Sequence, residues 1–177
     1  MTKKLPFHSI SRPPKEYNAA NSISRMIEGL GFRYYWATEG LRSKDLKYRP
    51  SQEAKSTIET LKHLYVLSKT IDESIQNKVS KRPVDEIPED FKSLRNITLD
   101  QLNQASLELK KIKDLDLENL KIVFERKGGS INNFPLWNLI NGPIADALYH
   151  TGQIVSFRRS SGNPIPKGVN VFLGIKN

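Results

Sequence analysis

The segment Ile144-Ala-Asp146-Ala-Leu-Tyr-His150-Thr-Gly-Gln-Ile154 places an acid and an imidazole four residues apart within an apolar helical pattern. Four residues are just over one helical turn, so Asp146 and His150 project from one face, about 40° apart around the helix axis. The apolar residues beside this face indicate that it turns towards a core. There, a carboxylate and an imidazole need a metal ion, a mutual hydrogen bond or a water-filled cleft, because burying them alone costs several kcal/mol.

The other histidine within a strong helical pattern is His63, in the segment Ile58-Glu-Thr-Leu-Lys-His63-Leu-Tyr-Val-Leu67. One ligand from an early helix and an i, i+4 pair from a late helix are a workable way to build a metal site inside a helical bundle. If His63, Asp146 and His150 share one ion, their nearest ligand atoms should lie about 3–4 Å apart, given metal–ligand bonds of about 2.0–2.2 Å.

The composition limits the class of protein. A chain of 177 residues, 37% hydrophobic and 27% charged, is typical of one soluble domain, which we expect to span residues 1–177. The absence of cysteine excludes disulfides, thiolate metal sites and a cysteine nucleophile. No stretch approaches the length of a membrane span, and the basic start lacks the apolar region of a signal peptide. We therefore expect a cytoplasmic protein without a membrane partner.

The net charge of +9 raises the question of a nucleic-acid partner. Lysines and arginines are spread along the chain with acids between them, and none of the common nucleic-acid-binding motifs is recognisable. A diffuse positive charge of this kind more often indicates a solvated surface with a general attraction to anions. We therefore expect no specific nucleic-acid partner.

Hydrophobic periodicity predicts four helices, over approximately residues 17–39, 51–75, 98–112 and 133–158. Their expected N-terminal signals are Ser51, the capping-box sequence Thr98-Leu-Asp-Gln101, and Asn133 followed by Pro135. Four amphipathic helices in this order predict an all-α fold, an up-and-down four-helix bundle.

The remaining segments are expected to embellish the bundle. Residues 1–15 are a polar, proline-containing arm, residues 79–96 form a long crossover, and residues 165–177 form a C-terminal tail. Lys121–Arg126 has an extended pattern and is followed by a turn at residues 127–130. A terminal strand at Val169–Ile175 could pair with Lys121–Arg126, which would add a small two-stranded sheet.

Three segments, taken together and in this order, resemble the DinB/YfiT-like family of four-helix-bundle metalloenzymes. They are Leu61-Lys-His63-Leu64, Phe134-Pro-Leu-Trp-Asn138 and Tyr149-His150-Thr-Gly-Gln-Ile154, and the resemblance covers about residues 17–154. Members of this family typically bind a divalent metal through one histidine of the second helix and two histidines four residues apart on the last.

By this resemblance, His63 and His150 match two ligand positions and Asp146 stands at the third, as in a divergent subgroup. Two histidines and one carboxylate form a sound ligand set for Zn, Ni, Fe or Mn, with open positions for water or substrate. The resemblance also implies hydrolase or thiol-transferase (S-transferase) chemistry on an unknown small molecule, and a homodimer.

Each candidate residue has a structural alternative. His63 can be a hydrogen-bonded structural residue, and Asp146 and His150 can form an intrahelical hydrogen bond that faces a wet groove. The chain would then be a non-catalytic bundle that binds a partner or ligand and has lost its metal site. Glu59, one turn before His63, is either a further ligand or hydrogen-bond acceptor for the site, or an exposed helical residue. The candidates for lining the same cleft are Asn141, Tyr149 and Gln153.

The end of the first helix is rich in glycine and aromatic residues. These are Gly29, Gly31, Phe32, Tyr34, Tyr35 and Trp36. Close packing at glycine together with apolar surface predicts a dimer contact through the bundle helices. The alternative is that the aromatic side chains fill the core of the chain's own bundle.

Overall fold

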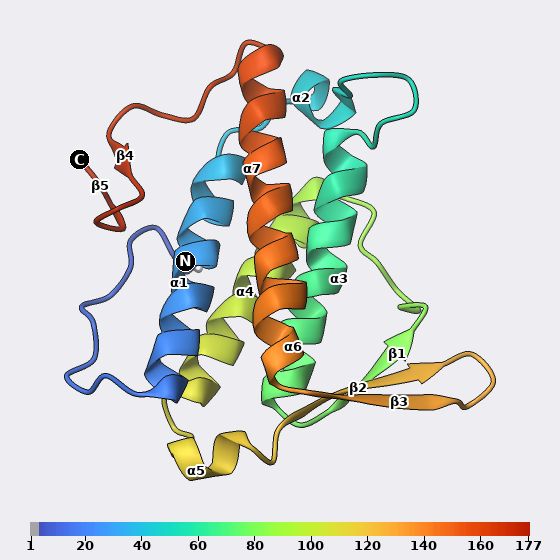
Figure 1. Cartoon of the computed structure of the whole chain (residues 1–177). Helices are drawn as coiled ribbons and strands as arrows, with labels where there is room; N and C mark the ends of the chain where they lie inside the picture. Colours follow the sequence, from blue (N-terminus) through green and yellow to red (C-terminus); the bar gives the residue numbers. More distant parts are fainter. Residues whose placement is uncertain (1–3) are drawn as a thin grey trace.

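The computed structural model describes residues 4–177, apart from the side chain of Leu115, so the first three residues of the predicted arm lie outside the described residues. Four long helices form a bundle (Figure 1). They are α1 (Ala19–Thr38), α3 (Thr57–Ile75), α4 (Phe91–Leu109) and α7 (Ala145–Ser160). Helices α1 and α3 each contact both α4 and α7, so the core lies between all four.

Shorter elements connect and extend the bundle. They are α2 (Ser43–Lys47), β1 (Val79–Arg82), α5 (Asp114–Leu117), β2 (Lys121–Arg126), β3 (Ile131–Pro135), α6 (Trp137–Leu139), the π-helical turn η1 (Ile140–Ile144), β4 (Val169–Asn170) and β5 (Ile175–Lys176). The β2–β3 ribbon projects away from the bundle, and β4 and β5 lie on the opposite side of the molecule (Figure 1).

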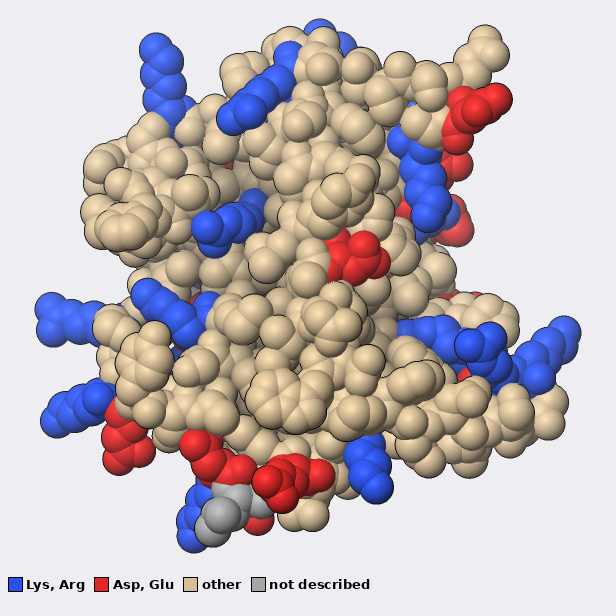
Figure 2. Space-filling model, in the orientation of Figure 1, with Lys and Arg blue, Asp and Glu red and all other residues tan. Residues whose placement is uncertain are grey.

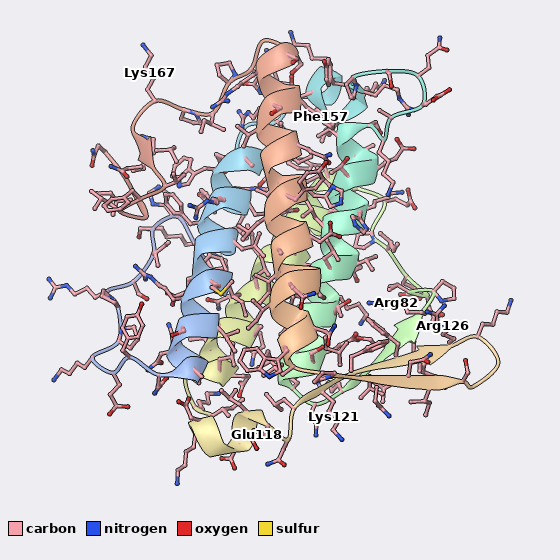
Figure 3. All side chains as sticks on the ribbon, in the orientation of Figure 1. Arg82, Glu118, Lys121, Arg126, Phe157 and Lys167 are labelled. Atoms are coloured by element: carbon pink, nitrogen blue, oxygen red, sulfur yellow. The ribbon has the colours of Figure 1, made fainter. Side chains whose placement is uncertain are left out.

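The predicted all-α class is wrong, because the chain also forms a three-stranded mixed sheet. Strand β2 pairs in parallel with β1 and antiparallel with β3. Arg82 and Arg126 are register partners at the far end of the β1–β2 ladder (Figure 3). The expected pairing of Lys121–Arg126 with the C-terminal segment does not occur, since β4 pairs with β5 in a separate small hairpin.

Two of the strands come from segments that the sequence assigned otherwise. Val79–Arg82 was expected in a crossover, and Ile131–Pro135 overlaps the predicted start of the fourth helix. Asn133 followed by Pro135 is compatible with a helix start, but Pro135 is also tolerated at the end of an edge strand, where no ladder donor is needed. Gly128 and Gly129 adopt positive φ values of 100° and 82°, which close the predicted turn and return the chain along β2.

Two helix starts also differ from the prediction. Helix α3 begins after Ser56 rather than Ser51, with a reciprocal capping box between Ser56 and Glu59. Helix α4 begins after Asp90, whose carboxylate accepts a hydrogen bond from the Ser93 backbone amide, so Thr98 lies inside the helix. Ser56 provides the cap in place of Ser51, and Asp90 provides it in place of Thr98. All four of these residues can accept a backbone hydrogen bond, so the sequence does not show which one caps the helix.

The predicted fourth helix is interrupted before the turn that carries Asp146. Gly142 has non-helical dihedral angles (φ −96°, ψ −105°), and Pro143 follows it within η1. Proline lacks the amide hydrogen that would continue the helical ladder, so a wider turn forms here. Helix α7 starts directly afterwards, at Ala145. The turn η1 therefore sets which face of α7 lies against α3.

The aromatic residues near the end of α1 pack within the chain itself. Phe32, Tyr34 and Trp36 are buried, and the Phe7 ring lies over Gly31, where an added Cβ atom would come within 2.5 Å of it. This packing fits the alternative that these side chains fill the chain's own core. Dimerisation stays a prediction. None of the helices within residues 4–177 is both long enough and apolar enough to cross a membrane.

Candidate metal centre

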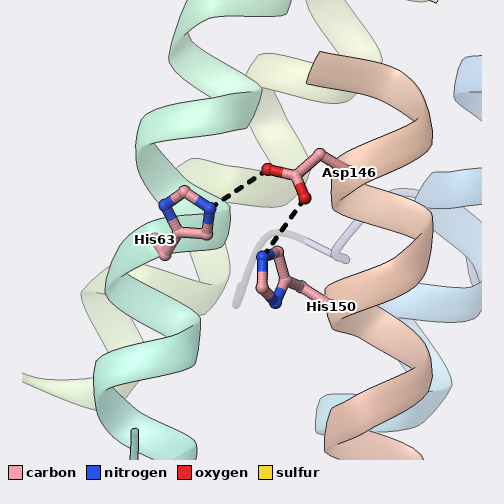
Figure 4. A group of neighbouring side chains, drawn as sticks. All are labelled: His63, Asp146 and His150. Carbon is pink, nitrogen blue, oxygen red and sulfur yellow. Dashed lines mark hydrogen bonds and ion pairs between the residues drawn. The ribbon is translucent and has the colours of Figure 1, made fainter. Parts of the chain in front are cut away.

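The three candidate ligands meet at the contact between α3 and α7. His63 projects from α3, and Asp146 and His150 project from successive turns of α7 (Figure 4). One ligand atom from each of the three residues lies within 4.8 Å of the other two. The predicted convergence of His63, Asp146 and His150 is confirmed, although they lie up to 87 positions apart in the sequence.

Asp146 lies between the two imidazoles. Its Oδ2 atom is 3.2 Å from His63 Nε2, and its Oδ1 atom is 3.3 Å from His150 Nε2. The two imidazole rings are in edge contact, with their centroids 4.6 Å apart. Separations near 3.3 Å are those expected for neighbouring ligands of one tetrahedral ion with bonds of about 2.0–2.2 Å.

The cluster is open to solvent on one side. The exposed fractions are 17% for the His150 side chain, 31% for His63 and 42% for Asp146. A closed structural metal site surrounds its ion with protein ligands, whereas a catalytic site keeps a position for water or substrate. The partial exposure of all three groups corresponds to the second arrangement.

The protonation state of His63 also suits a ligand. Partial burial lowers the pKa of His63, and the nearby charges of His150 and Lys55 lower it further, while the hydrogen bond with Asp146 opposes this effect. The imidazole is therefore neutral at pH 7. A neutral imidazole and a carboxylate are the forms in which histidine and aspartate bind divalent metals.

His150 has a second polar partner, Gln153, one turn further along α7. Its Nδ1 atom lies 2.7 Å from Gln153 Oε1. When Nδ1–H donates this hydrogen bond, the neutral ring carries its lone pair on Nε2, which faces Asp146 Oδ1. Two acceptors at 3.3 Å repel each other unless a proton or a cation lies between them. The donor set thus fits a cation at this position.

The other candidate site residues divide into two groups. The Tyr149 ring lies 5.2 Å from the His150 ring and is mostly exposed, so Tyr149 and Gln153 both border the cluster. Asn141 is exposed in η1, outside the hydrogen-bond network of the three described side chains. Glu59 is engaged with the cap of α3 and with Arg49, which corresponds to the structural alternative for this residue.

Two contacts were not found from the sequence, one beside His63 and one at the far end of α7. Lys55, just before α3, adds positive charge near His63. Buried Arg158 donates hydrogen bonds to the carbonyl groups of Trp36, Ala37 and Glu39, which fixes the end of α7 against α1. The Gly142-Pro143 pair was the available signal for the turn before α7, whereas no local pattern marks the partners of Arg158.

Models of known protein families and a search of curated proteins give no match to this chain.

Proposed function

We propose that His63, Asp146 and His150 bind one divalent metal ion and that the chain is a metal-dependent enzyme. The observation that carries this proposal is the convergence of three ligand atoms within 4.8 Å at a partly exposed position. In the forms that bind a metal, two imidazoles and one carboxylate together carry a net charge of −1, which favours a cation. A ligand set of two imidazoles and one carboxylate suits zinc, iron, manganese or nickel.

The resemblance to the DinB/YfiT-like family supports the reaction class. It implies a hydrolase or a thiol transferase, in which a bound ion would activate water or a low-molecular-weight thiol, or polarise a substrate. The residues of this chain would supply the remaining functions. Gln153 would orient His150, and the exposed Tyr149 ring would border the substrate position beside it.

The alternative is a helical bundle that has lost its metal and binds a partner or ligand without catalysis. The observation that favours it is the direct contact between His63 Nε2 and Asp146 Oδ2 at 3.2 Å, which satisfies both groups without an ion. In this case His63 donates from Nε2 and has no lone pair there for a metal. The two functions therefore require opposite tautomers of His63.

Metal analysis of untagged protein tests the proposal. Purified wild-type protein is expected to contain close to one equivalent of a transition metal or zinc per chain, and to bind zinc again after chelation. His63→Ala and His150→Ala should each lose the metal. His8→Ala is the matched control, because His8 packs against Trp36 and belongs to no metal-ligand cluster within the described residues.

Catalysis is tested separately with a chromogenic ester and with an electrophilic aryl chloride plus a low-molecular-weight thiol. Metal-dependent turnover of either substrate that is lost in His63→Ala would support the enzyme. Stoichiometric metal without turnover would support metal binding alone. A wild-type protein that neither contains nor binds a divalent ion would contradict the metal site and leave the non-catalytic bundle.

A further inference from the structure

The C-terminal hairpin presents three consecutive exposed apolar side chains at its tip, Val171, Phe172 and Leu173. Phe172 is 92% exposed. Scattered single apolar residues are normal on protein surfaces, but a run of three with no cover within the described chain is unusual and marks an interaction site. The tip lies on the side of the bundle opposite the β2–β3 ribbon (Figure 1).

The tip is held in a defined conformation. The Asn170 side-chain oxygen accepts hydrogen bonds from the backbone amides of Phe172 and Leu173, and the Gly174 amide donates to the Asn170 carbonyl at 2.8 Å. Gly174 adopts a φ of +69°, and its position against Ile10 leaves no room for a Cβ atom. A fixed turn presents the apolar side chains without the entropy cost of ordering them on binding.

The N-terminal arm packs against the base of the tip. The Ile10 amide donates to the Gly174 carbonyl at 2.8 Å, and Phe7 anchors the same arm in the core. The tail also packs on α1, where the Lys176 ammonium group lies 5.8 Å from the centroid of the Trp36 ring. Arm, tail and tip therefore form one continuous surface, which we define as residues 4–15 and 164–177.

This surface is strongly cationic. It contains five basic residues and no acidic residue. These side chains supply five of the chain's nine net positive charges. The basic residues are Lys4, Arg12, Lys15, Lys167 and Lys176, and all are exposed. Lys167 projects from the tail (Figure 3). Other Lys and Arg side chains project from this side of the molecule (Figure 2).

We propose that the tip inserts into the surface of an anionic lipid bilayer, with the basic residues of the arm and tail on the lipid headgroups. An apolar tip with basic residues on the adjoining arm and tail matches the two layers of such a surface, acyl chains beneath negative headgroups. A second copy of the chain fits less well, because two identical cationic surfaces would repel each other. If the proposed function holds, this binding would keep the metal site near the membrane surface.

Co-sedimentation with vesicles tests the proposal. The full chain is expected to bind vesicles of phosphatidylcholine with about one-third phosphatidylglycerol, and not vesicles of phosphatidylcholine alone. Phe172→Ser combined with Leu173→Ser should weaken binding at least about tenfold, since each side chain loses its apolar burial. Raising the salt to about 1 M should also weaken binding, because it shortens the screening length to about 3 Å.

The matched control is Ile131→Ser combined with Trp137→Ser, which also removes two exposed apolar side chains but from β3 and α6, outside the tip, arm and tail. This control should bind like wild type. Equal binding of the tip variant and wild type would overturn the proposal. So would a dimer by light scattering that the tip substitutions convert to a monomer, because the tip would then contact a second copy. Metal content should not change in either variant, so this test is independent of the metal site.

Discussion

The Nδ1 atom of His150 lies 2.7 Å from Oε1 of Gln153, one helical turn further along α7. Helical periodicity alone brings this pair together, since residues three positions apart share a face. The hydrogen bond selects the ring nitrogen that faces Asp146, because the donor at Nδ1 leaves Nε2 free. Ligating histidines in proteins almost always have such a second partner, which fixes the tautomer and the orientation of the ring.

Replacing Gln153 should therefore weaken metal binding without removing a ligand. Gln153→Leu, which keeps the size but removes the acceptor, is expected to lower zinc affinity by about 10- to 100-fold in titration calorimetry. Gln153→Glu keeps an acceptor and should stay near the wild-type affinity. Gln104→Leu, on the exposed side of α4, is the control. Wild-type affinity in Gln153→Leu would show that the hydrogen bond does not orient the ligand.

Asp146 should determine which metal the site prefers. A carboxylate lowers the charge of the ion–ligand group by one relative to imidazole and makes the site harder. Asp146→His creates a set of three histidines and is expected to bind nickel more tightly. Asp146→Ala should weaken the binding of every divalent ion. Calorimetry with nickel and manganese distinguishes the variants, and unchanged affinity in both would exclude Asp146 as a ligand.

Asp45 should stabilise the fold in a pH-dependent way. Hydrogen bonds from the Arg42 guanidinium, aided by those from Ser161 and Asn163, hold the pKa of the buried Asp45 carboxyl well below its usual range, against the opposing effect of burial. A depressed folded-state pKa contributes stability above the unfolded-state pKa of about 3.9, and this stability is lost as the pH falls. Asp45→Asn is expected to cost about 2–3 kcal/mol at pH 7.

Urea unfolding at several pH values checks this prediction. The difference in unfolding free energy between wild type and Asp45→Asn should be constant near neutral pH and should shrink below about pH 4. A difference of the same size at pH 3 and pH 7 would mean that shape, rather than the ionised carboxylate, accounts for the effect.

Neighbouring arginines at the end of α7 should behave very differently. Arg158 is buried and donates to three carbonyl groups at the end of α1, whereas Arg159 is exposed. Arg158→Met would leave these carbonyls without donors, with an expected loss of about 3 kcal/mol or more in unfolding free energy. Arg159→Met should change it by less than about 0.5 kcal/mol. Thermal unfolding of the two variants is a direct comparison, and equal losses would contradict the structural role of Arg158.

The sequence predicted the bundle and the candidate site because both rest on helical periodicity. The apolar patterns of α1 and α3 and the i, i+4 spacing of Asp146 and His150 are local, so one chain is enough to recognise them. Glu59 shows the limit of the same reasoning. Its spacing from His63 was compatible with a ligand, but the nearer Ser56 holds its carboxylate in a cap.

Strand pairing was beyond the reach of the sequence. Parallel pairing of β1 with β2 joins segments about 40 residues apart, with no turn between them to fix the register. Residues 131–135 carry signals for both a helix start and a strand, and pairing with β2 decides between them. The predicted fold class was therefore wrong, because short segments pair into a sheet and no local sequence pattern indicates that pairing.

The sequence by itself determined that Asp146, His150 and Gln153 share one helical face, because the rise and rotation of a helix fix their relative positions. Only the tertiary structure decided that His63 lies 3.2 Å from Asp146, since this distance depends on how α3 and α7 pack. It also decided which apolar residues stay exposed. Phe172 and Phe32 are the same residue type, yet one lies at the tip of a hairpin and the other in the core, because burial is a property of the assembled chain.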